Sequence, residues 1–245
     1  EKDLAYQKKA LVNWDPIDQT VLANEQVLPD GTSERSGGKV IQKPLKQWFF
    51  KITNYAEELL DFNNLDWPSK TISMQKNWIG KSVGAKLSFK LEKEDINIDI
   101  FTTRPDTLFG CTYLVLSPEF PDLLTFIDSE YKDSVSSYCN EVKNKNEKQR
   151  TDDRLEKTGV FTGLYALNPI NNKTIPIWIS DYVLMSYGTG AIMAVPGHDQ
   201  RDYEFAKKYS IEILKVIDNG SKISLDDKAF TGNGYCVNSG FLNNL

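Results

Sequence analysis

Three threonine hydroxyls lie within the stretch 102–107, which reads Thr-Thr-Arg-Pro-Asp-Thr. The stretch follows an alternating apolar segment that predicts a β-strand. Pro105 favours a turn at the end of this strand, and threonine hydroxyls can donate or accept hydrogen bonds. Such a cluster could hold a water molecule and a polar ester. Taken alone, the stretch is more typical of a turn stabilised by Thr and Asp side chains than of a binding site.

A second polar group lies at 198–205, which reads His-Asp-Gln-Arg-Asp-Tyr-Glu-Phe and follows a turn of Pro and Gly. Asp199 and Asp202 are three residues apart, so they can share one face of a helix. One carboxylate could project into a pocket and pair with an ammonium group. Asp199 would also suit the N-cap of the helix, where acidic groups are favourable. The local pattern leaves both interpretations open.

Other kinds of site find little support. His198 is the only histidine, and a serine–histidine–aspartate hydrolase would have to use it, yet no Gly-x-Ser-x-Gly motif is present. The spacing of His198 and its acidic neighbours does not support a metal site, so we expect no metal. Arg104 and Arg201 could contact phosphate, although surface salt bridges are the commoner role. Gly188 and Gly190 do not complete a dinucleotide fingerprint, and there is no P-loop.

The composition is ordinary for a soluble globular protein. The chain has 245 residues, 40% apolar and 26% charged, which suffices for one large domain or one domain with an appendage. The formal net charge is −5, so any contact with nucleic acid must be local. Three widely spaced cysteines argue against a disulfide framework and favour a reducing compartment.

The N-terminus of the chain and the length of its apolar segments give information on localisation. No stretch resembles a signal peptide or is long enough to span a membrane, so we expect a protein that is neither secreted nor bound to a membrane. The chain begins at Glu1 without a methionine, which suggests a fragment of a longer protein.

The elements that must position these residues fall into two parts. In residues 1–80, the spacing of Trp48, Phe49, Ile52, Tyr55, Leu59 and Leu60 predicts one amphipathic helix, and Met74 and Trp78 predict a second. From residue 81 the pattern changes to strands, beginning with a hairpin of 87–91 and 96–100.

Further strands are predicted at 108–116, 160–167, 174–179 and 191–195, with helices at 120–150 and around Phe205 and Tyr209. Residues 143–150 are expected to be exposed. This pattern indicates an α+β fold, a distorted β-barrel decorated with helices. The expected domains are 1–80 and 81–245.

Two long stretches carry a family resemblance. Residues 101–113, Phe-Thr-Thr-Arg-Pro-Asp-Thr-Leu-Phe-Gly-Cys-Thr-Tyr, and residues 187–206, beginning Tyr-Gly-Thr-Gly-Ala-Ile-Met-Ala-Val-Pro-Gly-His-Asp-Gln-Arg-Asp, resemble the two editing motifs of the leucyl-tRNA synthetase family. Residues 12–27 and 74–80 resemble its bacterial and organellar branch, which indicates a bacterial cytoplasm or an organelle. The related editing domains of isoleucyl- and valyl-tRNA synthetases are the alternative, but their motifs differ.

The resemblance implies a hydrolase that removes noncognate amino acids from tRNA(Leu), such as isoleucine, norvaline or methionine, and spares leucine. It implies that Thr102 and Thr103 orient the water and polarise the ester, and that Asp202 binds the α-ammonium. It assigns substrate binding to Arg104, Thr107, Tyr187, Met193, Val195, His198 and Asp199. Among these, Thr107 would be the steric gate and Arg104 would contact the terminal adenosine or its phosphate.

The chain departs from the family in two ways. Asp15 stands in the Asn-Trp-x-Pro motif and residues 30–40 lack the cysteines with which many relatives bind zinc, so we expect no zinc. The His-Ile-Gly-His and Lys-Met-Ser-Lys motifs of adenylate formation are absent, so ATP and Mg²⁺ would serve only a missing synthetic domain. We expect a monomer whose editing needs no cofactor and whose partner is the tRNA(Leu) 3′ end. A non-catalytic module that binds this end is the competing class.

Overall fold

The computed structural model describes residues 3–143, 145, 150, 155–185, 188–220, 225 and 227–245. It divides the chain into two compact units, unit 1 (Glu1–Lys81) and unit 2 (Ser82–Leu245). The described helices include none that is long and apolar enough to cross a membrane.

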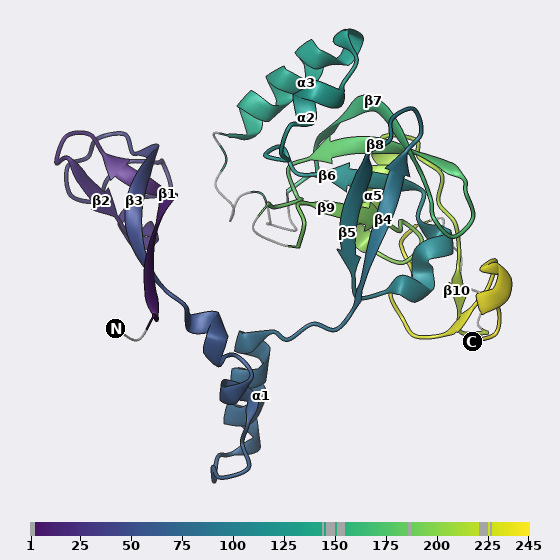
Figure 1. Cartoon of the computed structure of the whole chain (residues 1–245), viewed down its shortest axis with the longest axis horizontal. Coiled ribbons are helices and arrows are strands. Elements are labelled where there is room, and N and C mark those ends of the chain that lie inside the picture. Colours follow the sequence, from purple (N-terminus) through teal and green to yellow (C-terminus); the bar gives the residue numbers. More distant parts are fainter. Residues whose placement is uncertain are drawn as a thin grey trace. The chain divides into compact units, whose positions relative to one another are not determined.

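Unit 1 is built on a three-stranded antiparallel sheet (Figure 1). Strand β1 (Ala5–Asp15) lies in the centre, between β2 (Thr20–Leu22) and β3 (Ile41–Phe50). The long pairing of β1 with β3 runs from Ala5 opposite Phe50 to Trp14 opposite Ile41. A short 3₁₀ helix, η1 (Asn24–Gln26), follows β2.

The predicted amphipathic helix from Trp48 to Leu60 is wrong. Trp48 lies in β3, and two 3₁₀ turns follow, η2 (Ile52–Tyr55) and η3 (Glu58–Leu60). The apolar spacing merged a strand with these turns, because pairing with β1, almost 40 residues earlier in the chain, overrides local periodicity. The second predicted helix is confirmed as α1 (Ser69–Ile79), which ends at Gly80 with a left-handed φ of 64°.

Unit 2 contains a six-stranded mixed sheet in the order β5-β4-β7-β8-β6-β9. The predicted hairpin is confirmed as β4 (Ala85–Leu91) and β5 (Asn97–Thr102). The later predicted strands are confirmed as β7 (Gly159–Leu167), β8 (Thr174–Ser180) and β9 (Ala191–Ala194). Strand β6 (Tyr113–Leu116) pairs parallel with β8 and antiparallel with β9.

The sheet curls without closing. Its two outer strands, β5 and β9, lie close to one another, but no backbone ladder joins them within the described residues. The expected α+β editing-domain fold is therefore confirmed, with an open, strongly curled sheet in place of a closed barrel.

Two apolar layers cover the sheet. One face of the curled sheet encloses the main core, which includes Phe89, Ile100, Leu114 and Ile177. The other face of β6 and β9 packs through Tyr113, among others, against α5 (Gln200–Lys208), which confirms the predicted helix at Phe205.

Two further expectations need correction. Residues 108–116 are not one strand, because the 3₁₀ helix η4 (Pro105–Gly110) precedes β6. The helix predicted at 120–150 is two helices, α2 (Leu123–Phe126) and α3 (Ser129–Val142), and α3 packs on β7. Arg150, expected to be exposed, is buried and donates from Nε to the carbonyl of Asp181 at 2.7 Å. Most of 143–150 lies outside the described residues.

The C-terminal tail carries short elements, as expected: β10 (Ile217–Asp218), β11 (Tyr235–Cys236) and η5 (Gly240–Leu242). The two strands pair antiparallel.

Candidate functional site

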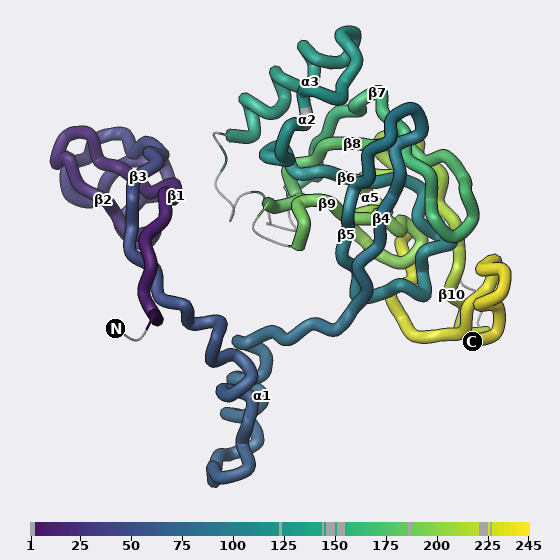
Figure 2. The backbone as a smooth tube through the Cα atoms, in the orientation of Figure 1, coloured from purple at the N-terminus to yellow at the C-terminus, as the bar shows by residue number. Residues whose placement is uncertain are grey.

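The topology of unit 2 brings the two motifs to one region. The threonine-rich stretch begins where β5 ends at Thr102, passes through η4 and leads into β6 (Figure 2). The first residue of β6, Tyr113, pairs with the last residue of β9, Ala194. The chain then enters the second motif, so the two motifs share one end of the β6–β9 pair.

Close packing joins the motifs. A Cβ added at Gly110 would lie 2.7 Å from Val216 Cγ2 and 3.2 Å from Val195 Cγ1, so only glycine fits between them. Leu108 belongs to the same buried cluster as Met193 and Val195. The predicted pocket-lining residues Met193 and Val195 are thus buried beside the threonine-rich turn. Tyr187 lies outside the described residues.

Two of the three threonine hydroxyls close the turn. Thr102 Oγ1 accepts a hydrogen bond from the backbone N–H of Arg104 at 3.0 Å, and Thr107 Oγ1 donates to the carbonyl of Arg104 at 2.9 Å. Thr107 is only 2% exposed, and its branched side chain is therefore held in one orientation. Thr103 is exposed, and its hydroxyl has no partner among the described residues. Thr103 is the threonine free to bind a water.

Arg104 forms an ion pair with its neighbour Asp106. Its guanidinium donates from Nε and an Nη to the carboxylate of Asp106, at 3.0 and 2.8 Å, and this pairing raises the pKa of Arg104. The pair is partly exposed. A phosphate group would have to compete with Asp106 for the guanidinium.

Asn168, which directly follows β7, fixes the threonine-rich turn, and it was not identified from the sequence. It is fully buried, and its amide donates to the carbonyl of Leu108 at 2.9 Å while its oxygen accepts from the N–H of Ile170. A single Asn after a strand carries no signal of such a long-range contact.

Asp199 caps α5. Its side chain accepts hydrogen bonds from the backbone N–H groups of Arg201 at 2.9 Å and Asp202 at 3.1 Å. The N-cap interpretation of Asp199 is therefore confirmed, and the carboxylate that points into the fold is that of Asp202.

Asp202 is a buried carboxylate that forms no ion pair among the described residues, although the charge of Arg201 acts on it from a distance. It is 4% exposed; one oxygen accepts from the N–H of Val195 at 2.8 Å and the other from the hydroxyl of Tyr182 at 3.1 Å. Burial, followed by the negative charge of Asp199, raises its pKa to about 7. No Lys or Arg forms an ion pair with it in the described part of the chain. Each oxygen can accept a further hydrogen bond, so the group is suited to an additional cationic donor.

Two tyrosines that the sequence did not single out support this carboxylate. Besides the bond from Tyr182, the hydroxyl of Tyr113 donates to the backbone carbonyl of Asp202 at 3.0 Å. Burial raises the pKa of both phenols well above the usual range, so both remain donors. They come from different elements. Tyr113 ends the first motif, but no local pattern could have revealed that either hydroxyl bonds to Asp202.

His198 cross-links three segments of backbone. Its Nε2 accepts from the N–H groups of Val216 at 2.9 Å and Ile217 at 3.0 Å, so Nδ1 carries the proton and donates to the carbonyl of Phe230 at 2.9 Å. Burial lowers the pKa of His198, which keeps the ring neutral. With both nitrogens engaged, the ring is not free to act as a general base.

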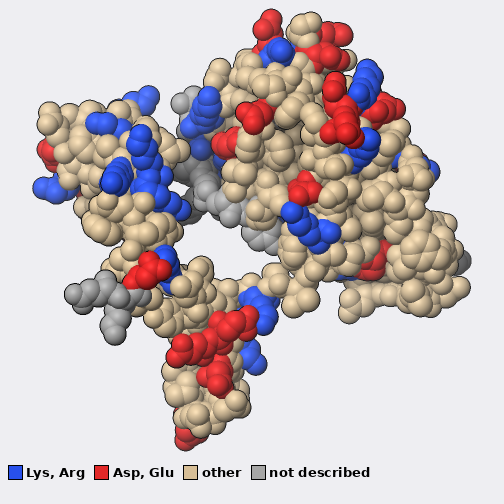
Figure 3. Space-filling model, in the orientation of Figure 1, with Lys and Arg blue, Asp and Glu red and all other residues tan. Residues whose placement is uncertain are grey.

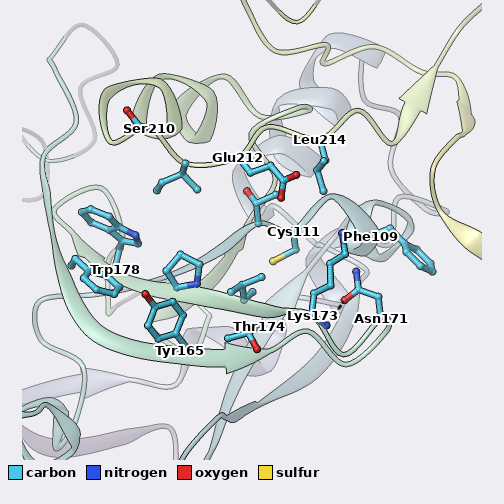
Figure 4. Close-up of a pocket in the computed structure, with 15 residues that line it drawn as sticks. Phe109, Cys111, Tyr165, Asn171, Lys173, Thr174, Trp178, Ser210, Glu212 and Leu214 are labelled. Atoms are coloured by element: carbon cyan, nitrogen blue, oxygen red, sulfur yellow. Dashed lines mark hydrogen bonds between the residues drawn. The ribbon is translucent and has the colours of Figure 1, made fainter.

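A cavity of about 370 Å³ lies in unit 2 at the end of the first motif, where Phe109, Cys111 and Thr112 line it. Tyr165, Thr174 and Trp178 line one wall, opposite the segment of Ser210 and Glu212 (Figure 4). None of the predicted site residues that the structure describes lines it. Cys111 does, but burial raises the pKa of this thiol far above its ordinary value, so it is not a nucleophile. We therefore locate the candidate site at the two motifs.

Comparisons with known proteins identify the family of the chain. The family described as "Leucyl-tRNA synthetase, editing domain" matches residues 76–245, which include both motifs. A leucine–tRNA ligase of Clostridium tetani is 54% identical over the whole chain, which spans 30% of that relative's length.

The crystal structure of a ternary complex of Agrobacterium radiobacter K84 LeuRS with tRNA and LeuAMS is 38% identical, with a TM-score of 0.67 over 94% of this chain and 28% of that one. The fold, the two motifs and these similarities show that the chain belongs to the leucyl-tRNA synthetase editing-domain family.

Proposed function

We propose that the chain hydrolyses the ester bond of misacylated tRNA(Leu), carrying for example isoleucine, norvaline or methionine, and spares Leu-tRNA(Leu). The observation that carries the proposal is Asp202, a buried carboxylate that forms no ion pair among the described residues. It is bonded to the backbone of Val195, whose side chain packs against the threonine-rich turn at Gly110. An α-ammonium is the cation that every aminoacyl ester provides.

In this mechanism Asp202 fixes the aminoacyl group. The ammonium adds a charged hydrogen bond to oxygens that already have neutral donors, and it favours the ionised carboxylate. Since all amino acids carry this group, the contact positions the ester without discriminating between side chains.

Discrimination is assigned to Thr107. Its held, branched side chain would clash with the γ-branch of leucine and admit noncognate side chains, with Met193 and Val195 forming the adjacent apolar wall. A second site of this kind supplies selectivity that a hydrophobic synthetic pocket, limited to about 1–3 kcal/mol per methylene, does not reach.

Hydrolysis itself would depend on a positioned water. The free hydroxyl of Thr103 binds the water, and Thr102 holds the turn in place. Positioning of this kind lowers a barrier by several kcal/mol without a protein general base, which agrees with the engaged nitrogens of His198. Arg104 would leave its ion pair with Asp106 and contact the terminal nucleotide instead. His198 and Asp199 maintain the conformation of the second motif through their hydrogen bonds.

The decisive experiment compares hydrolysis of Ile-tRNA(Leu) and Leu-tRNA(Leu) at high concentrations of the chain. We expect rapid loss of the isoleucyl ester only, and loss of both esters with Thr107→Ala. Asp202→Ala should inactivate the protein towards both. Retained tRNA binding with no hydrolysis by the unmodified chain would favour a binding-only module. Inactivity of His198→Ala, with its fold intact and Asp202→Ala active, would favour an unrelated hydrolase.

A further inference from the structure

One face of the β1–β3 pair is basic and aromatic, and the only acid on that side of β1 within the described residues, Asp15, is buried. Residues that pair across β1 and β3 point to the same side, and so do residues two apart in each strand. We call this side the lysine–tryptophan face; its members are Ala5, Gln7, Lys9, Leu11, Asn13, Gln42, Pro44, Lys46, Trp48 and Phe50.

Large aromatic groups lie open on this face. Trp48 is 70% exposed and Phe50 75% exposed, and they are neighbours on this face because they are two residues apart in β3. Leu11 is also exposed, but the Lys9–Lys46 pair lies between it and Trp48. Exposed aromatic groups that lie together mark an interaction site.

The charges point to an anionic partner. Lys9 lies directly opposite Lys46, an arrangement of like charges that destabilises a strand pair. Both lysines are exposed, and neither has an ion-pair partner among the described residues. Lys51, just past the end of β3, does have one, Asp3 at 2.7 Å. Lys9 and Lys46 are thus two unpaired cations next to one another on an exposed surface.

The opposite face of the same strands provides a comparison. There Lys8 lies over the ring of Phe49 at 4.6 Å, and Lys43 lies over Trp14 at 4.2 Å. These lysines are already engaged by aromatic rings. Lys9 and Lys46 have no such contact, although all four come from the same two strands.

We propose that the lysine–tryptophan face binds single-stranded RNA, with bases stacked on Trp48 and Phe50 and phosphates held by Lys9 and Lys46. Exposed aromatic rings beside paired cations are what sequence-tolerant binding of a single strand requires. A chain of net charge −5 can bind RNA only locally, and Figure 3 shows Lys and Arg side chains gathered over this sheet. The proposal concerns unit 1 and does not depend on hydrolysis in unit 2.

The test uses the whole chain and a fluorescent single-stranded RNA of about ten nucleotides, with a duplex of equal charge beside it. Fluorescence anisotropy gives the dissociation constant at several salt concentrations. Lys9→Ala with Lys46→Ala should weaken binding and lower the salt dependence by about 1.4 in log–log slope, or about 0.7 for each phosphate that is no longer neutralised. Trp48→Ala should weaken binding of the single strand about fivefold or more and leave duplex binding almost unchanged.

Lys8→Ala with Lys43→Ala is the matched control, because it removes the same charge from the opposite face. Circular dichroism verifies that every variant is folded. Equal losses in both double variants, or an unchanged salt slope for Lys9 and Lys46, would overturn the proposal. So would dispersal of a self-associated form by Trp48→Ala without any effect on RNA binding, which would make the face a protein contact.

Discussion

Asp15 in unit 1 and Asp202 in unit 2 are both buried aspartates that form no ion pair among the described residues, and they differ in what surrounds the carboxylate. Asp15 in unit 1 is 0% exposed and accepts from the hydroxyl of Ser36 at 2.6 Å and from the N–H groups of Ile17 and Asp18. These bonds, with that of Ser36 the most important, lower its pKa to about 2. Asp202 in unit 2 has only two donors on its carboxylate, and burial raises its pKa to about 7.

The number of hydrogen-bond donors to each carboxylate distinguishes a structural aspartate from one that can bind a ligand. Asp15 is saturated by its own turn, so its charge stabilises the fold and offers nothing to a ligand. Asp202 is left short of donors, which costs stability and leaves the carboxylate able to accept a cation. Both side chains are almost inaccessible to solvent, so accessibility alone does not reveal which aspartate binds a substrate.

The largest expected effect is on activity. Asp202→Asn should reduce deacylation of Ile-tRNA(Leu) about 100-fold or more, because the neutral amide does not hold the ammonium. The same change should raise stability near neutral pH by up to a few kcal/mol, since it removes a charge that the fold disfavours. Kinetics and calorimetry on one preparation check both. If the variant were active, or less stable than the unmodified chain, the distinction between a ligand-binding Asp202 and a structural Asp15 would be wrong.

The converse change should affect stability alone. Asp15→Asn should lower the unfolding temperature of unit 1 by several degrees, because the amide cannot accept from Ser36 as well as from the backbone. Deacylation by unit 2 should stay within about twofold of the unmodified chain. Differential scanning calorimetry locates the affected transition. A loss of hydrolysis with an unchanged melting profile would reverse the roles assigned to the two residues.

The pH dependence of the two units should run in opposite directions. The lowered pKa of Asp15 means that its contribution is present above about pH 4 and is lost as pH falls towards 2. The raised pKa of Asp202 means that unit 2 loses stability as pH rises from about 4 to 7. The lowered pKa of His198 acts in the opposite sense below about pH 6.5, so the effect of Asp202 is read by comparison with Asp202→Asn. Acidification from about pH 8 to 5 should stabilise unit 2 relative to unit 2 of that variant and leave unit 1 unchanged. Parallel shifts of both calorimetric transitions would contradict this.

Tyr182→Phe should have a moderate effect. Loss of one of the two donors leaves Asp202 less well oriented and raises its pKa further, since the bond from Tyr182 lowers it. We expect deacylation to fall about tenfold and the acid limb of the pH–rate profile to move to higher pH. Tyr209→Phe is the control, because that hydroxyl bonds to Gly159 instead. A slower rate without any shift in the profile would indicate a purely structural role for Tyr182.

Asp199→Asn should have the smallest effect, and it should shift the pH–rate profile in the direction opposite to that of Tyr182→Phe. The negative charge of Asp199 raises the pKa of Asp202, so its removal should move the acid limb to lower pH. Asparagine is also a good N-cap, which should keep α5 intact. The pH–rate profile of this variant beside that of Tyr182→Phe provides a direct test. Shifts of the same sign in both variants would mean that Asp202 is not the group that titrates.

Local patterns predicted the elements with regular periods. The alternation in β4, β5, β7 and β8 and the cap at Asp199 are properties of neighbouring residues, and the structure confirms them. The helix predicted through Trp48 failed because β3 exists only by pairing with β1. Arg150 was placed at the surface because its partners lie some 30 residues away.

The sequence by itself determined the two motifs, their order and the family, because these depend only on residue types and spacing along the chain. It identified Thr103 and Asp202 as candidates, but only the family resemblance favoured Asp202, since the local pattern did not distinguish the capping aspartate from the buried one. Only the tertiary structure decided which threonine hydroxyl is free, that Tyr182 holds Asp202, and that both ring nitrogens of His198 are engaged. These are matters of hydrogen-bond partners and desolvation, which arise when segments distant in sequence pack together.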